Sequence, residues 1–478
     1  VHELADVGWD NPQIALLWRY NQHYFDDLNA MDAPTRLDWQ RALVQRWCDD
    51  NPPGRGTAWA PYPTSLRIVN WVKWFLAGET PAPAWRHSLA VQARWLTRRL
   101  EWHLLGNHLF ANAKALVFAG LLFDGDEAEA WLATGLRILD RELPEQFLAD
   151  GGHFERSPMY HALALEDLLD LLNLIEARAP ATSPLRRVDD ELRRCASGML
   201  HWQRCLRHPG GALARFNDGA EGIAPTTDAL ERYATALGVH APPGAATTHL
   251  AASGYVRATR GTATAFIDVA PVGPDYLPGH AHADTLCFEL SVGGRELIVN
   301  RGTSVYGSGP RRTWERGTAA HSTVQIGDID SSEVWSGFRV GRRARPGPVR
   351  FDDSGAQVVV EGSHDGYAHL AGAPRHHRRW RLDAGALEVD DRIEPSLPGP
   401  ATARLHFAPG LELAPDGGRG WRLNEGGTER ARLDILAGGT AAPTTTQHAL
   451  RFGERVDATT LELELADGRA AVRITWPA

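Results

Sequence analysis

The hydrophobic pattern of this 478-residue chain changes its period once, and that change limits what the chain can fold into. Through residues 18–237 apolar residues recur every three or four positions, as in the leucine-rich run 163–172, and this spacing is the helical period. From about residue 264 onward, short segments alternate apolar and polar residues and are separated by Gly, Asp and Pro. The chain therefore combines a nearly all-helical first half with a β-rich second half.

The stretch 238–253 separates the two patterns, because it is small, proline-rich and aperiodic. We therefore predict a helical domain over residues 1–240 and a β domain over residues 250–478. No helix of crossover length interrupts the second half, so its strands are predicted to pair in antiparallel fashion. The expected strands are Thr264–Val269, Cys287–Val292, Gln357–Val360, Ala386–Val389, Leu461–Leu465 and Ala471–Ile474.

Charge and hydropathy exclude some classes of partner. The formal charge is −9, whereas general nucleic-acid binders usually carry a basic surface. No apolar run approaches the roughly 20 residues that span a bilayer, and the first residues do not resemble a signal peptide. We expect no nucleic-acid or membrane partner and a monomer or weak homodimer. Because Val1 is equally compatible with a mature or trimmed end, a periplasmic or secreted bacterial location is favoured without excluding the cytoplasm.

The chain has four cysteines, Cys48, Cys195, Cys205 and Cys287, and none forms a CxxC pair. Four are too few for a disulfide framework or a thiolate zinc site. We interpret them as buried thiols, which suits Cys287 in the alternating segment around it.

A first polar cluster lies in the sequence 59–74. Arg67, Asn70, Trp71 and Trp74 recur every three or four residues, and Trp59 precedes them. Arginine, amide and indole groups on one helix face can bind a sugar acid, with the ring on tryptophan and the carboxylate on arginine. The alternative is an amphipathic helix that uses its tryptophans for packing.

A second cluster combines Asn107 and His108 with Tyr160 and His161. The first pair precedes one predicted helix and the second pair opens another, so the four side chains can meet at one end of a helical ring. An Asn-His pair alone is weak evidence, because helix caps and buried histidines explain most such pairs.

A third cluster follows in the β-rich half. His282, Asn300 and His321 offer two imidazoles and an oxygen on successive strands, which is a plausible ligand set for a divalent metal. The competing interpretation is a histidine–aspartate hydrogen-bond network that includes Asp284.

Together these clusters resemble the heparinase II/III family of polysaccharide lyases. The resemblance runs from the segment NQHYFDDL at residue 21 to EVWSGFR at residue 333. It implies an N-terminal α/α toroid, an incomplete barrel, followed by a C-terminal antiparallel β-sandwich, with the catalytic groups between them.

The family's catalytic residues resemble Asn107, His108, Tyr160 and His280, and its metal ligands fall on His282, Asn300 and His321. Asn300 stands where the family usually has an aspartate, so we expect one structural divalent ion, Mn²⁺ or Zn²⁺, with Mn²⁺ preferred over tightly held Zn²⁺. The residues expected to bind substrate are Trp59, Arg67, Asn70, Trp71, Glu155, Arg156, Tyr306, Arg316 and Trp335.

The implied reaction is β-elimination at a uronic acid, which yields an unsaturated uronate. Donors such as Asn107 and His108 would neutralise the carboxylate and acidify the C5 proton. Tyr160, with a pKa depressed by neighbouring cations, would accept that proton and then protonate the leaving oxygen. His280 would be the partner base for the opposite C5 configuration.

The implied substrate is an anionic polysaccharide, either a glycosaminoglycan such as heparan sulfate, chondroitin or hyaluronan, or alginate or a bacterial exopolysaccharide. Two other classes stay open. A glycoside hydrolase would need two carboxyl groups about 5–9.5 Å apart, for which Glu155 and Asp218 are the candidates. A non-catalytic glycan-binding protein of the same fold is favoured by Asn300 and disfavoured by the presence of Asn107, Tyr160 and His280.

Overall fold

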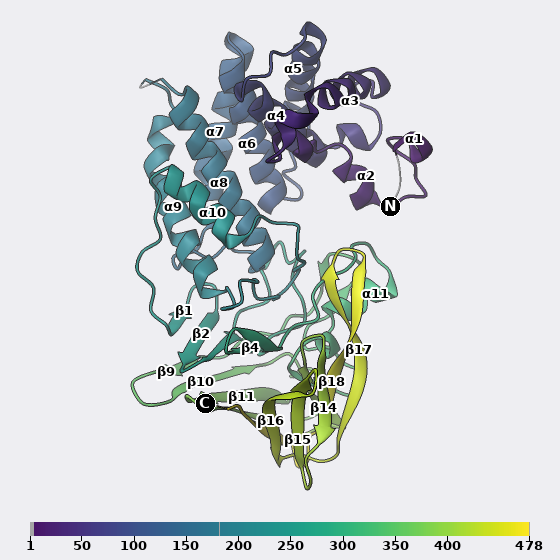
Figure 1. The fold of residues 1–478 in the computed structure, drawn as a ribbon, viewed down its shortest axis with the longest axis vertical. Coiled ribbons are helices and arrows are strands. Elements are labelled where there is room, and N and C mark those ends of the chain that lie inside the picture. Colours follow the sequence, from purple (N-terminus) through teal and green to yellow (C-terminus); the bar gives the residue numbers. More distant parts are fainter. Residues whose placement is uncertain (1–3, 181, 478) are drawn as a thin grey trace. The chain divides into compact units, whose positions relative to one another are not determined.

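The computed structural model describes residues 4–180 and 182–477. Helices occupy the chain up to Ala236 and strands dominate from Thr248 onward, as the change in hydrophobic period predicts. The helices are α1 Leu4–Val7, α2 Leu16–Asn21, α3 Leu37–Asp50, α4 Pro61–Leu76, α5 Pro83–Thr97, α6 Gly106–Leu122, α7 Asp126–Gln146, α8 Pro158–Arg178, α9 Arg186–Cys205, α10 Thr227–Ala236 and α11 Pro310–Arg316 (Figure 1).

The chain divides into two compact units whose limits differ from the helix-to-strand boundary. The first unit is Val1–Gln146 with Asp167–Arg193, and the second is Phe147–Glu166 with Arg194–Ala478. Helices α8 and α9 thus contribute residues to both units. The C-terminal part of α9 belongs with the strands because Trp202, Cys205 and Leu206 share a buried cluster with Tyr255 and Phe266 of the first sheet.

The first unit is a set of packed helices centred on α6. This helix is apolar on nearly all sides and is buried from Leu109 through Ala119, as expected for a helix that neighbours surround. It packs against α4, α5 and α7. Helix α4 begins at Pro61, a residue well suited to a first helical position because its nitrogen has no proton to leave unpaired.

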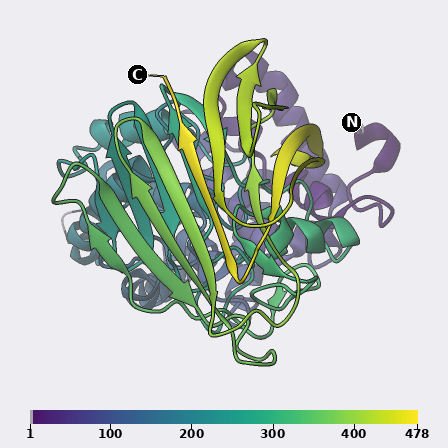
Figure 2. The ribbon, with the colours of Figure 1, turned by 90° about the horizontal axis from the view of Figure 1, so that it is seen from below.

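The second unit contains antiparallel sheets of five, eight, four and two strands. Their orders are β1-β2-β3-β4-β5, β14-β15-β16-β19-β12-β11-β10-β9, β17-β18-β13-β6 and β7-β8. In Figure 2 the strands of the eight-stranded sheet lie side by side, with the yellow β19 among its green neighbours.

The bounds in the first half of this unit are β1 Thr248–Leu250, β2 Tyr255–Arg260, β3 Ala263–Asp268, β4 Phe288–Val292, β5 Arg295–Ile298, β6 Val324–Ile326, β7 Val334–Trp335, β8 Arg339–Val340 and β9 Arg350–Asp352. The later strands are β10 Val358–His364, β11 Arg375–Leu382, β12 Ala386–Glu394, β13 Ala401–His406, β14 Leu411–Pro415, β15 Gly420–Glu425, β16 Thr428–Ala437, β17 Ala441–Arg451, β18 Glu454–Glu464 and β19 Arg469–Thr475.

One large apolar core joins the three larger sheets. Phe288 of the five-stranded sheet, Trp380 and Val472 of the eight-stranded sheet and Leu461 of the four-stranded sheet all belong to it. Buried and partly exposed residues alternate along β10 and β11, so one face of each strand points into this core. The architecture is therefore an antiparallel β-sandwich following a helical toroid.

Candidate active site

A tyrosine and a histidine of the second unit stack against each other. Tyr160 lies in the first turn of α8, where its backbone nitrogen donates to Ser157 Oγ at 3.1 Å. His280 lies in the loop between β3 and β4, and the two ring centroids are 3.7 Å apart with an interplanar angle of 28°. The second unit therefore places a phenol and an imidazole, the two groups best suited to proton transfer, in direct contact.

Tyr306 extends this pair on the phenol side. The hydroxyl oxygens of Tyr160 and Tyr306 are 2.9 Å apart, and the Tyr306 ring meets Phe338 edge to face at 5.2 Å. Phe338 also contacts the His280 ring edge to face at 5.9 Å. Phe338 follows the β7 segment and is exposed, and no sequence pattern marks it as part of a site.

Both tyrosines are held as neutral phenols. Burial raises the pKa of Tyr160 well above its ordinary value, and Tyr306 and the negative charges of Asp218 and Glu155 raise it further. Burial and Asp218 raise the pKa of Tyr306 in the same direction. The predicted depression of the Tyr160 pKa is therefore wrong, because burial raises this pKa most and the carboxylates of Asp218 and Glu155 raise it further.

Asp218 is the buried carboxylate behind His280. Its Oδ2 is 2.9 Å from His280 Nδ1 and its Oδ1 is 2.9 Å from His282 Nε2. The Arg312 guanidinium binds both oxygens, with Nη2 at 2.7 Å from Oδ2, and Thr303 Oγ1 donates to Oδ1 at 3.1 Å. Burial raises the pKa of Asp218, but Arg312 and the two histidines outweigh it, so the pKa lies well below its usual range.

This arrangement argues against the hydrolase alternative. Asp218 has no exposed side-chain surface, and its oxygens are bound by Arg312, His280, His282 and Thr303. A hydrolytic carboxylate must instead reach the sugar or an attacking water. Glu155 lies near the same histidine, with its Oε2 at 3.7 Å from His280 Nε2.

The predicted metal residues lie together in the second unit. The ring centroids of His282 and His321 are 5.3 Å apart, and Asn300 Oδ1 accepts from His321 Nδ1 at 3.0 Å. Among the described residues, His282 Nδ1 and His321 Nε2 are buried and make no hydrogen bond. Unpaired imidazole nitrogens on rings held from behind are chemically suited to binding a divalent ion.

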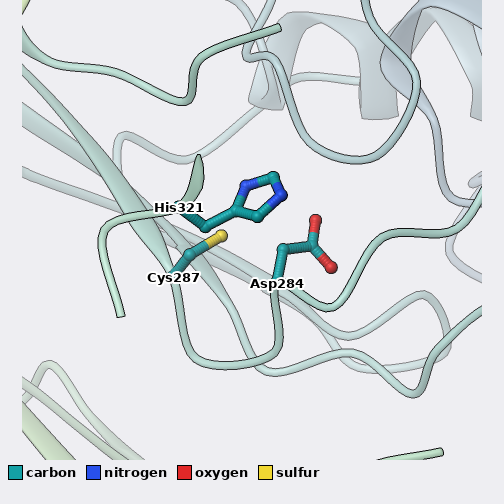
Figure 3. A group of neighbouring side chains, drawn as sticks. All are labelled: Asp284, Cys287 and His321. Carbon is teal, nitrogen blue, oxygen red and sulfur yellow. The ribbon is translucent and has the colours of Figure 1, made fainter. Parts of the chain in front are cut away.

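Two further donors lie beside His321. Figure 3 shows the Asp284 carboxylate and the Cys287 thiol next to its ring, and ligand atoms of the three residues lie within 4.8 Å of one another. Cys287 is fully buried, as are Cys195 and Cys205, whereas Cys48 is partly exposed. Asn300 sits behind His321, and its amide nitrogen donates to Glu289 Oε1 at 3.1 Å.

Comparison with known proteins identifies the family. A model described as Heparinase II/III N-terminus matches residues 35–237, and one described as Heparinase II/III-like, C-terminal matches residues 242–476. The chain belongs to the heparinase II/III family.

Named relatives and solved structures agree with this assignment. A heparin-sulfate lyase of Bacteroides stercoris is 25% identical over 305 residues, which are 58% of this chain and 45% of that protein. A heparin-sulfate lyase of Bacteroides thetaiotaomicron is 24% identical over 383 residues, which are 70% of this chain and 52% of that protein. This chain thus spans about half the length of the curated relatives it matches. A crystal structure of heparinase III shares the fold with a TM-score of 0.77 at 18% identity, covering 96% of this chain and 76% of that one.

The Asn-His pair of the heparinase II/III resemblance lies in the first unit, at the start of α6. Leu105 and Gly106 have positive φ angles of 55° and 52°, so the backbone before the pair is strained at Leu105. His108 Nδ1 is 3.1 Å from Glu101 Oε1, and its ring lies 4.5 Å from that of Tyr62. Asn107 and His108 are both partly exposed.

The aromatic face of α4 is a packing face, contrary to the predicted sugar-binding role. Arg67 is fully buried, stacks on Trp47 at 3.9 Å and donates to Gln92 Oε1 at 2.9 Å. Trp59 and Trp71 are buried against Trp47, with centroids 5.9 and 5.6 Å away. Asn70 Nδ2 donates to Tyr24 O at 2.9 Å. These side chains have no surface left for a sugar, because the helices of the first unit close over them.

The other predicted substrate residues fall into three groups. Arg156 and Arg316 are buried and donate to backbone oxygens of Ser253 and Ala281, so they hold loops in place and do not present a guanidinium to a ligand. Trp335 is 55% exposed, and its indole is free to stack on a sugar. Glu155 and Tyr306 adjoin His280 and Tyr160, as described above.

One functional residue was missed entirely. Arg312 of α11 is fully buried and binds Asp218, and its Nε donates to Gly337 O at 3.0 Å. Its guanidinium lies 4.9 Å from the Tyr306 ring centroid. Nothing in the local sequence separates it from the adjacent Arg311, since only the fold shows which arginine meets the carboxylate.

No helix in the described ranges 4–180 and 182–477 is both long and apolar enough to cross a membrane.

Proposed function

We propose that this protein is a lyase that cleaves a glycosaminoglycan, with heparan sulfate as the first candidate, by β-elimination. The observation that carries the proposal is the stacked Tyr160–His280 pair, a proton donor beside a proton acceptor. The names of the relatives, all heparin-sulfate lyases, support the choice of polymer. Chondroitin, hyaluronan, alginate and bacterial exopolysaccharides are the alternatives that the experiment below separates.

The raised pKa of Tyr160 indicates which residue of the pair donates a proton and which accepts one. A neutral phenol donates, so we assign Tyr160 to protonate the departing C4 oxygen and His280 to accept the C5 proton. The C5–H electron pair forms the C4–C5 double bond as the C4–O bond breaks, and no water is consumed. His280 then carries an extra proton and Tyr160 lacks one. Transfer of a proton from His280 to Tyr160 returns both residues to their starting protonation states.

The uronate carboxylate also needs a partner, because charge accumulates on it as the C5 proton leaves. We assign that role to Asn107, with His108 beside it at the start of α6. A neutral amide donor stabilises developing negative charge without forming a tight ground-state ion pair.

We further propose that His282, Asn300 and His321 form a site for one divalent ion. The imidazole nitrogens His282 Nδ1 and His321 Nε2 would bind it, and Asn300 would orient His321. Asp284 and Cys287 would supply nearby anionic donors. Imidazole and thiolate donors favour Zn²⁺, so we revise the preference for Mn²⁺ that Asn300 alone suggested. The ion would supply positive charge that holds the loops beside His280.

Metal analysis tests this site apart from catalysis. We expect about one equivalent of Zn²⁺ after purification without chelator, and a lower melting temperature after EDTA treatment. Cys287→Ser should weaken retention, whereas Cys195→Ser is the matched control with a buried thiol elsewhere. Less than about a tenth of an equivalent, with a melting temperature indifferent to EDTA, would show a hydrogen-bonded cluster instead.

The activity test follows the ultraviolet absorbance of unsaturated uronate with purified protein on heparan sulfate, chondroitin sulfate, hyaluronan and alginate in parallel. The proposal requires that heparan sulfate give the largest rate and that each cut produce one unsaturated end. Binding without cleavage of any polymer would indicate a glycan-binding protein. Reducing ends released without the ultraviolet signal would indicate hydrolysis.

A polymeric anionic substrate also suggests where the protein acts. We propose a periplasmic or secreted bacterial enzyme, because such polymers are found outside the cytoplasm. We also propose that it functions as a monomer or weak homodimer. Light scattering on the purified chain gives the oligomeric state directly.

A further inference from the structure

We propose that Asp218, clamped by Arg312, is a positioning residue that fixes the tautomers of both His280 and His282. This inference deepens the proposed function, on which it rests for the roles of the two histidines. It concerns how one buried carboxylate prepares a proton acceptor and a metal ligand at the same time.

The Arg312 guanidinium binds both oxygens of Asp218, and Thr303 donates to one of them, so Asp218 is an ionised carboxylate that can only accept hydrogen bonds. Each imidazole nitrogen in contact with it must therefore carry the proton. His280 donates through Nδ1 to Oδ2 at 2.9 Å, and His282 donates through Nε2 to Oδ1 at 2.9 Å.

In a neutral imidazole the opposite nitrogen then carries the lone pair. In His280 the acceptor is Nε2, the nitrogen nearer to Glu155. The His280 side chain keeps 13% of its surface exposed. In His282 the acceptor is Nδ1, which is buried without a hydrogen-bond partner among the described residues. The two histidines thus present opposite nitrogens because they share one carboxylate.

Arg312 makes the carboxylate suitable for this task. Its guanidinium binds both oxygens of Asp218, and it is itself fixed by its bond to Gly337 O. Thr303 supplies a further donor to Oδ1. The negative charge is thereby stabilised in a fully buried position, where a lone carboxylate would take up a proton. The main chain adds a constraint, since Asp218 N donates to His280 O at 3.0 Å.

The same unit contains a matched control. Asp391 in β12 is also buried and ionised, binds Arg378 through two bonds of 2.6 and 2.9 Å, and accepts from His376 Nε2 at 2.6 Å. It lies in the eight-stranded sheet and contacts neither His280 nor His282. Asp391→Asn therefore reproduces the chemical change of Asp218→Asn at a carboxylate that bonds to neither His280 nor His282.

The first experiment observes the tautomers in the unmodified protein. Long-range ¹H–¹⁵N spectra of histidine-labelled protein distinguish the two tautomers, and spectra of His280→Gln and His282→Gln identify the two signals. We expect Nδ1–H for His280 and Nε2–H for His282. The reverse tautomer at either ring overturns the proposal, whether or not the protein cleaves any polymer. Failure of the lyase assay with these tautomers in place would count against the proposed function alone.

The second experiment is kinetic. An amide at position 218 replaces one accepting oxygen with an NH2 donor, and the ring that faces this donor must present an unprotonated nitrogen, so one histidine must invert. We expect kcat to fall at least about 10²-fold with KM nearly unchanged. Asp391→Asn should lower the melting temperature yet leave kcat within about twofold of the wild type. Equal effects of the two substitutions on kcat would overturn the positioning role. If Asp218→Asn does not fold, Arg312→Lys makes the same comparison by weakening the clamp on both carboxylate oxygens.

Discussion

At the scale of single residues, the surroundings of Tyr160 decide what its hydroxyl can do. Sequence reasoning selected this tyrosine and predicted a depressed pKa, but the described neighbours are Tyr306, Asp218 and Glu155, which raise it together with burial. The residue was identifiable from its motif. The direction of its pKa was not, because Asp218 and Tyr306 lie 58 and 146 positions away along the chain.

Tyr160→Phe tests the proton-donor role. The substitution removes one oxygen and keeps the ring that stacks on His280, so folding and polymer binding should persist. Turnover should fall by about 10²–10⁴-fold, the usual contribution of a general acid or base. The ultraviolet assay gives the rate and thermal melting gives the fold. Retention of more than about a tenth of the wild-type rate would remove Tyr160 from this role.

Asn107→Ala tests the neutralisation of the substrate carboxylate. An amide whose hydrogen bond strengthens as charge develops should lower kcat more than it changes KM, by about 2.7–4 kcal/mol in activation free energy. Steady-state kinetics on heparan sulfate separates the two constants. A rise in KM with unchanged kcat would make Asn107 a binding residue.

At the scale of elements, a buried ion cluster joins three helices of the first unit. Lys73 of α4 and Lys114 of α6 both bind Asp170 of α8, each with an Nζ–Oδ2 distance of 2.5 Å. Burial raises the pKa of Asp170, but the two ammonium groups outweigh it and lower the pKa to about 2. The cluster therefore stays charged at neutral pH and fixes how these helices meet.

Asp170→Asn should destabilise the protein strongly, because two lysines lose their shared buried partner. Breaking a buried charge network by removing one member usually costs about 3–5 kcal/mol. Glu127→Gln is the matched control, since its pair with Arg94 joins α5 and α7 at an exposed surface, where an ion pair contributes little to stability. Denaturant titration of both variants measures the two free energies of unfolding. Similar values would show that burial of the cluster does not matter.

At the scale of the whole molecule, neutral buried histidines make the fold sensitive to mild acid. Burial lowers the pKa of His23 in the first unit and of His161 in the second to about 3 each. In the unfolded chain a histidine has a pKa near 6.5, so between about pH 6.5 and pH 3 the unfolded state binds more protons. Stability is therefore fully present above this window and is lost as the pH falls through it.

The difference between the histidine pKa values in the folded and unfolded states sets the expected loss of stability. At pH 5 each of these two histidines should remove roughly 2 kcal/mol from the free energy of unfolding relative to neutral pH. Denaturant titrations at pH 7 and pH 5 measure the loss, and His23→Gln should reduce the difference between the two. A free energy that is the same at both pH values would contradict the assignment of neutral, buried rings.

The sequence by itself determined the classes of structure and the location of the chemistry. Hydrophobic period is a local property, so helices up to Ala236 and strands from Thr248 could be predicted from neighbouring residues alone. The family motifs likewise marked Tyr160, His280 and the residues around His282.

Only the tertiary structure decided which side chains are exposed to a ligand and which are buried. It buried Arg67 and Trp71, which share the amphipathic spacing of a binding face, because neighbouring helices cover that face. It also brought Asp218 and Arg312, 94 positions apart, into contact, with Asp218 bonded to both His280 and His282. Such contacts depend on strand register and helix packing, and no local pattern encodes them.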